Sequence, residues 1–92
     1  MATPSDVAVA VWMKQQVDHT HWLDQEHAAS LIFGQFGEQH IYYNENGNLA
    51  ISRSVLRAFR KLTEQTVVWV RPQKAWRSRT PYDPPGKREV DY

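Results

Sequence analysis

The pattern of apolar and polar residues is clearest between residues 52 and 63, where it has the period of an amphipathic helix. Ser52 is placed as its N-cap. The predicted helix should pack its apolar arc on a core and present the opposite, basic arc outward, although a surface helix with merely solvated cations has the same pattern. The apolar arc holds Val55, Leu56, Ala58, Phe59 and Leu62, and the basic arc holds Arg53, Arg57, Arg60 and Lys61.

A first helix is predicted from Pro4 to about Val17, because Thr3 can cap it and Asp6 can return a bond to the cap. Its middle, residues 7–13, is apolar on every side, which a helix on the outside of a small monomer would not bury completely. Either the protein's own hairpin or a second subunit covers it, and we favour a homodimer contact through residues 5–17. The alternating β-branched residues leave a strand as the competing prediction.

A short strand at Trp22-Leu23 should lead into a second helix, which Asp24 caps and Gly37 ends. Gly34 inside this helix indicates close packing against a neighbouring backbone. The inner stripe of the helix is expected to be Ala28, Leu31, Ile32, Gln35 and Phe36.

Two hairpins are predicted after the second helix. The first joins residues 40–43 and 49–51, with a type I′ turn at Asn46-Gly47. The second joins residues 66–70 and 75–79 around a polar loop that contains Pro72. Residues 81–92 hold three prolines and should form an extended or disordered tail outside the core, after a domain at residues 1–80.

This order of elements is α+β and resembles a winged helix: three helices, a C-terminal β-hairpin, and a short extended insertion between helices two and three. The resemblance implies DNA binding through the third helix and the hairpin. The insertion of about fifteen residues departs from a compact helix-turn-helix, in which only a few residues join the second and third helices. The matching residues are Leu23-Asp24-Gln25, Ala28-Ala29 and Ile32 on helix two, Val55-Leu56 and Phe59 on helix three, and residues 66–79.

The sequence is also similar, over roughly residues 9–79, to a family of short bacterial proteins of unknown function. The shared positions are core and turn residues, so they imply a fold more than an activity. They are Phe36-Gly37, Asn46-Gly47-Asn48, Ile51, Val55-Leu56, Phe59-Arg60, Val68-Trp69 and Trp76-Arg77.

Charge is divided unevenly along the 92 residues. Residues 1–50 hold one Lys and six acids, a net charge of −5, and residues 51–92 hold ten Lys and Arg and four acids, a net charge of +6. A basic half suggests a surface for nucleic acid or an acidic partner, and the simpler alternative is that Arg57 and Arg60 pair with acids of the N-terminal half.

The basic residues of the third helix and the second hairpin are therefore the candidate DNA-binding site. Arg53, Ser54 and Arg57 lie near the helix start, where base edges are reached, and Arg60 and Lys61 are better placed for phosphates. In the hairpin, Lys74, Arg77 and Arg79 would hold the flanking backbone. Tyr42, Tyr43 and Trp76 could stack on unpaired bases, whereas Trp69 is expected in the core.

Other chemistry has little support. His19 and His21 have the spacing of paired ligands on a strand, but no third ligand follows at a convincing distance, so we predict no metal and no cofactor. Cysteine is absent, and no catalytic serine motif or glycine-rich phosphate loop occurs. The longest apolar run, residues 7–13, is too short to span a membrane and lacks the features of a signal peptide, so a cytoplasmic location is expected.

The sequence thus predicts a small non-enzymatic module that binds double-stranded DNA through the basic helix 52–63 and the basic hairpin 66–79. The alternative from another class is a protein–protein interaction adaptor that uses the apolar first helix and the Trp-rich hairpin.

Overall fold

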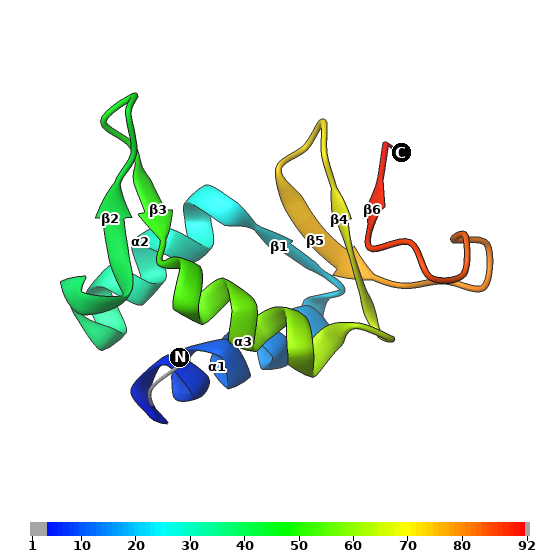
Figure 1. Ribbon diagram of the computed structural model, residues 1–92, viewed down its shortest axis with the longest axis horizontal. Helices are drawn as coiled ribbons and strands as arrows, with labels where there is room; N and C mark the ends of the chain where they lie inside the picture. The colour runs from blue at the N-terminus through cyan, green and yellow to red at the C-terminus, as the bar shows by residue number, and fades with distance from the viewer. Residues whose placement is uncertain (1–3, 92) are drawn as a thin grey trace.

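The computed structural model describes residues 4–91 and has an α+β fold with two sheets. Figure 1 shows the two hairpins β2–β3 and β4–β5 standing on one side, near opposite ends of helix α3. The elements are α1 (Pro4–Thr20), β1 (Trp22–Asp24), α2 (Gln25–Phe36), the 3-10 turn η1 (Glu38–His40), β2 (Ile41–Tyr43), β3 (Leu49–Ile51), α3 (Arg53–Thr63), β4 (Val67–Val70), β5 (Ala75–Ser78) and β6 (Glu89–Val90).

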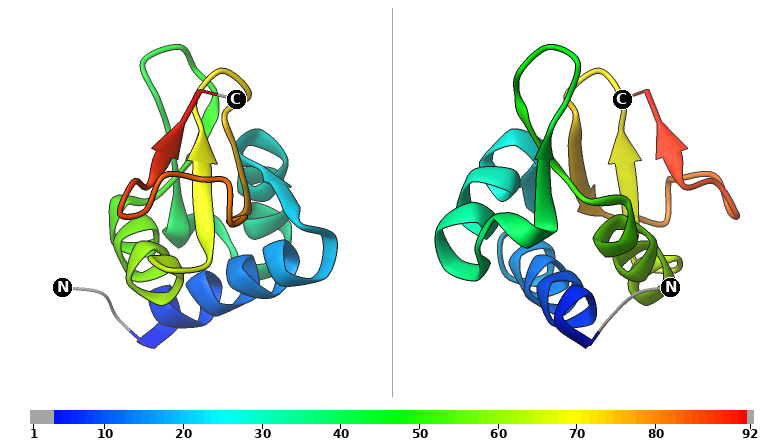
Figure 2. Two further views of the ribbon diagram at one scale, coloured as in Figure 1. Left: turned by 90° about the vertical axis from the view of Figure 1, so that its right-hand side faces the viewer. Right: turned by 60° about the vertical axis from the view of Figure 1, so that its left-hand side comes forward.

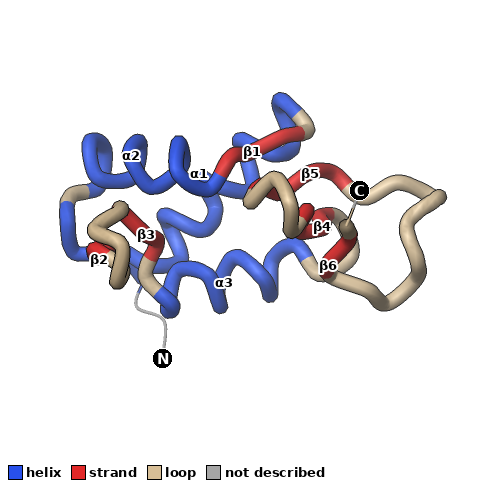
Figure 3. Tube along the Cα trace, turned by 90° about the horizontal axis from the view of Figure 1, so that it is seen from above, coloured by secondary structure: helices blue, strands red, loops and turns tan. Residues whose placement is uncertain are grey.

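The larger sheet has the strand order β1-β5-β4-β6. Strand β1 pairs antiparallel with β5, β5 pairs antiparallel with β4, and β6 is parallel to β4. Strands β2 and β3 form a separate antiparallel pair. Helix α3 packs mainly against α1, and α2 packs on β3. Figures 2 and 3 show α1 beneath these elements and α2 and α3 on opposite sides of the molecule.

The first predicted element is a helix, α1, and not the competing strand, and it continues to Thr20. It buries Val9, Met13 and Val17 completely. The other side stays partly open, because Val7 is 40% exposed and Val11 is 38% exposed. Thr3, the predicted cap, lies outside the described residues.

Asp6 has a partner that the sequence analysis did not predict. Its carboxylate is buried and lies 3.0 Å from Nδ1 of His40, while Nε2 of the same imidazole lies 2.9 Å from the Ser5 hydroxyl. The start of α1 therefore holds the end of η1, because a buried carboxylate needs a donor and a buried imidazole offers one.

Helix α2 begins and ends as predicted. The Asp24 carboxylate accepts the His27 N–H at 3.1 Å, and Gly37 ends the helix with a φ of +90°. The predicted inner stripe was wrong at Gln35, which is exposed, whereas Ala29 is buried. The explanation for Gly34 was also wrong, since open space surrounds the position of a Cβ there.

The β2–β3 hairpin confirms the two extended segments but not the turn type. Only Gly47 has a positive φ, +78°, whereas a type I′ turn needs positive angles at both central residues. The Asn44 side chain instead accepts the N–H groups of Asn46 and Asn48, each at 3.0 Å. This side chain therefore shapes a wider five-residue loop.

Helix α3 has the predicted boundaries, with the Ser52 hydroxyl 3.5 Å from the Val55 N–H. Its apolar face is rotated slightly from the prediction. Leu62 is 39% exposed, and Thr63 is buried in its place and donates to the Phe59 carbonyl at 2.7 Å. The core continues into the sheet where the Phe59 ring meets the Trp76 ring edge-on, at 5.2 Å between centroids.

The prediction that residues 81–92 lie outside the core was wrong for several of them. Val90 is buried beside Val68 and Val70. Arg77 donates two hydrogen bonds to the buried carboxylate of Asp83, at 2.9 and 2.7 Å. The proline-rich segment is thus folded back on the sheet by contacts that its composition does not reveal.

We predict that His40→Ala lowers the free energy of unfolding by about 2–4 kcal/mol, because the buried Asp6 carboxylate loses a donor. Urea unfolding measures the change. The control is His27→Ala, an exposed site on α2, which should change stability by less than about 0.5 kcal/mol. Equal losses for the two variants would show that the Asp6–His40 contact is not specifically stabilising.

We also predict an acid-dependent effect of Asp83→Asn. Hydrogen bonds from Arg77 hold the pKa of the Asp83 carboxyl well below its usual range, despite burial. A lowered folded-state pKa adds stability above the unfolded pKa of about 4, and this stability is lost as the pH falls. The melting temperature of Asp83→Asn should therefore lie below that of the wild type at neutral pH and approach it in acid, whereas Glu45→Gln, at an exposed site in the β2–β3 loop, should change the melting temperature little. A pH-independent difference for Asp83→Asn would contradict this assignment.

Candidate nucleic-acid interface

The outer face of α3 carries four exposed cations, Arg53, Arg57, Arg60 and Lys61. Within residues 4–91, no ion pair joins any of them to a carboxylate. The alternative in which Arg57 and Arg60 pair with acids of the N-terminal half is therefore not seen. Because these cations are unneutralised and lie along one helix, their field adds on that side of the molecule.

Ser54 lies at the edge of this face. Its side chain is half-buried, and its hydroxyl is 3.4 Å from the hydroxyl of Ser52. It therefore belongs to the capped first turn, beside Arg53, as the sequence placed it.

The predicted hairpin residues do not all join α3 in one surface. Lys74 is exposed in the β4–β5 loop, which Figure 1 shows at the far end of the hairpin from α3. Arg77 forms an ion pair with the carboxylate of Asp83. Arg79 donates to the carbonyls of Pro84 and Lys87. Two of the three hairpin cations therefore hold the C-terminal segment, and the structure brings only Arg79 near the end of α3.

Arg88 was not among the predicted site residues, yet it reaches α3. It donates to the Thr63 and Val67 carbonyls, each at 2.8 Å, and to the Thr63 hydroxyl at 3.0 Å. Burial, followed by the charges of Arg60 and Arg79, lowers the pKa of Arg88 to about 10. The sequence holds one indication of this role: Gly86, a residue typical of turns, comes shortly before Arg88. The prolines of the same stretch instead indicated an irregular segment.

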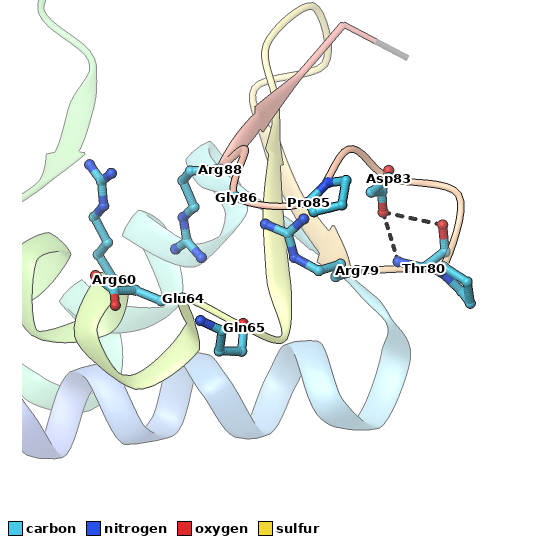
Figure 4. A pocket seen from close by; sticks show the side chains of 10 residues that line it. Arg60, Glu64, Gln65, Arg79, Thr80, Asp83, Pro85, Gly86 and Arg88 are labelled. Atoms are coloured by element: carbon cyan, nitrogen blue, oxygen red, sulfur yellow. Dashed lines mark hydrogen bonds between the residues drawn. The ribbon is translucent and has the colours of Figure 1, made fainter.

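Arg60, Arg79 and Arg88 line one recess beyond the C-terminal end of α3, with a volume of about 440 Å³. In Figure 4, Arg79 extends toward Arg88, and Arg60 stands on α3 at the other side of Arg88. Arg60 and Arg88 also border a second hollow of about 280 Å³, which is lined by Phe59, Trp69 and Trp76.

The aromatic residues differ in accessibility. Tyr42 and Tyr43 are exposed on β2, as base stacking would require. Trp76 is only 5% exposed because it packs against Phe59 and Trp69, so the prediction that it could stack on a base was wrong. Trp69, expected in the core, is half-buried.

The histidines serve in hydrogen bonds or lie on the surface. His21 Nδ1 lies 2.9 Å from the Ser78 hydroxyl, which links the end of α1 to β5. His19 and His27 are exposed. In the described part of the chain, no group of three or more His, Cys, Asp or Glu side chains could hold a metal ion.

Comparisons with known proteins place the chain in a family but not in a functional class. Neither the curated proteins nor the solved structures contain a significant match. Among residues 4–91, none of the helices has the length and apolar character needed to cross a membrane. Residues 5–78 match the sequence model of a family of unknown function, DUF6953. Since this match spans more than half of the chain, the protein belongs to that family.

Proposed function

We propose that this protein is a non-enzymatic, winged-helix-like module that binds double-stranded DNA. The strand order supports the winged-helix interpretation: β1, between α1 and α2, pairs with the second strand of the hairpin that follows α3. In that arrangement, α3 is the helix that enters a groove, and the β4–β5 hairpin is the wing.

The observation that best supports DNA binding is the exposed face of α3, whose cations lack carboxylate partners in the described residues. Arg53 and Arg57 lie toward the N-terminal half of the helix and are assigned to base edges, with Ser54 beside them. Arg60 and Lys61 are assigned to phosphates. Lys74 supplies a flanking contact from the hairpin loop, whereas Arg77 is omitted because Asp83 occupies it.

The docking geometry we propose differs from that of a compact helix-turn-helix. Helix α2 packs on β3 rather than crossing α3, and the β2–β3 hairpin separates the two helices in sequence. The duplex would therefore contact α3 without support from α2 across the phosphate backbone. The remaining contacts to the duplex would come from the β2–β3 and β4–β5 hairpins.

The alternative of another class is a protein–protein interaction adaptor that uses the Trp-rich hairpin and the apolar face of α1, which could bind a partner or a second copy of the chain. It is favoured by Val7 and Val11, which are one helical turn apart and partly exposed. A protein of this class would show no binding to duplex DNA at low salt. Its oligomeric state would instead depend on Val11, and Val11→Glu would convert a dimer to a monomer.

We predict that the double variant Arg57→Glu and Arg60→Glu weakens binding to a random-sequence duplex by at least about tenfold at about 50 mM salt. Both side chains are exposed, so the melting temperature should be retained. Fluorescence anisotropy measures the affinity. A salt titration should give a shallower slope for the variant, by about one unit for each phosphate that is no longer neutralised.

The control is Arg71→Glu with Lys87→Glu, which changes the net charge equally at exposed positions outside α3. Because Arg71 also loses its ion pairs with Glu89 and Asp91, the melting temperature of this variant is measured as well. The control variant should retain most of the affinity. Equal weakening by both double variants would mean that net charge alone governs binding. Absence of wild-type binding at about 50 mM salt would remove the DNA proposal.

A further inference from the structure

Three arginines from separate segments line the recess beyond α3. Arg60 comes from the last turns of the helix, Arg79 directly follows β5, and Arg88 directly precedes β6. Figure 4 shows Arg88 between Arg60 and Arg79, with the Arg79 side chain extended toward Arg88. Because these three arginines are far apart in the sequence, it is the fold that brings them to one recess.

Two of the three side chains are fixed in place. Arg79 donates to the Pro84 and Lys87 carbonyls, and Arg88 makes three hydrogen bonds around Thr63 and Val67. A guanidinium has five N–H donors, so at least two on Arg88 and three on Arg79 remain for another acceptor. Arg60 has no hydrogen bond or ion pair in the described part of the chain.

The carboxylates of the recess do not balance these charges. Only Glu64 and Asp83 carry acids into its lining, and Asp83 is already matched by Arg77. Three arginines therefore face one available carboxylate, that of Glu64, and the recess has a net charge of about +2. Burial is the main cause of the lowered pKa of Arg88, and the charges of Arg60 and Arg79 lower it further.

We propose that this recess binds a phosphate group. Phosphate carries between one and two negative charges near neutral pH and offers oxygens in several directions, which matches donors that arrive from three segments. A carboxylate has one charge and two coplanar oxygens, so it would satisfy fewer of them. Arginine also binds phosphate through paired N–H donors. The inference does not depend on duplex binding, since a free phosphate and a nucleic-acid phosphate share this chemistry.

The test is an NMR titration of the full chain with sodium phosphate against sodium chloride at constant ionic strength. The wild type should show saturable shifts at residues around the recess, with a dissociation constant on the order of 1 mM or tighter. Arg60→Gln should weaken this binding about tenfold, because it removes an unbonded guanidinium from the recess. Its fold should persist, since Arg60 is exposed, and the melting temperature checks this.

The matched control is Arg57→Gln, which removes the same charge from the same helix but does not line the recess. It should change phosphate affinity by less than about twofold, as a distant exposed charge would. Absence of saturable shifts in the wild type, or equal weakening by Arg57→Gln and Arg60→Gln, would overturn the proposal.

A second arm identifies the source of the phosphate. If phosphate at constant ionic strength displaces a bound duplex from the wild type but less effectively from Arg60→Gln, the recess takes a phosphate of the DNA backbone. If phosphate binds and leaves duplex affinity unchanged, the recess serves a free phosphate or phosphate monoester. A protein that binds phosphate but no duplex would retain this site while losing the proposed function.

Discussion

Burial of the apolar face of α3 determines where the other functional residues lie. Val55 and Phe59 are almost completely buried, and Phe59 also meets Trp76 of β5, so one helix joins α1 to the sheet. Burying each such side chain contributes about 1.5–3 kcal/mol, far more than repulsion among solvated arginines opposes. The basic face is consequently held outward by the core behind it.

In the C-terminal half of the chain, some cations bond to other parts of the protein and others are exposed to solvent. Arg77, Arg79 and Arg88 make hydrogen bonds to Asp83 or to backbone carbonyls, and they tie the last segment to the sheet and to the end of α3. Among these three, only Arg77 is neutralised by a carboxylate, since the carbonyls that Arg79 and Arg88 bond to carry no charge. Of the exposed cations in this half, four lie along α3, and the others are Arg71, Lys74 and Lys87.

The parts of the fold that depend on neighbouring residues were predictable from the sequence. Asp24, Gly37 and Ser52 mark helix ends by local chemistry, and both hairpins follow from strand patterns around turn residues. The missed features join distant residues. Asp6 resembled an ordinary first-turn acid until the fold brought His40 to it, and Arg88 lay in a proline-rich stretch whose composition indicates an irregular segment rather than a strand. Local periodicity carries no information about such partners.

The family match ends at Ser78, so it covers α3 but only part of the recess at its end. The exposed face of α3 lies inside the matched region, whereas Arg79 and Arg88 lie beyond it. Because Val68 and Val70 pack with Val90 in a cluster separate from the main core, the last segment can change with limited disturbance to the packing of the helices. Substitutions in the final residues would therefore change the lining of the recess while leaving the three helices packed on one another.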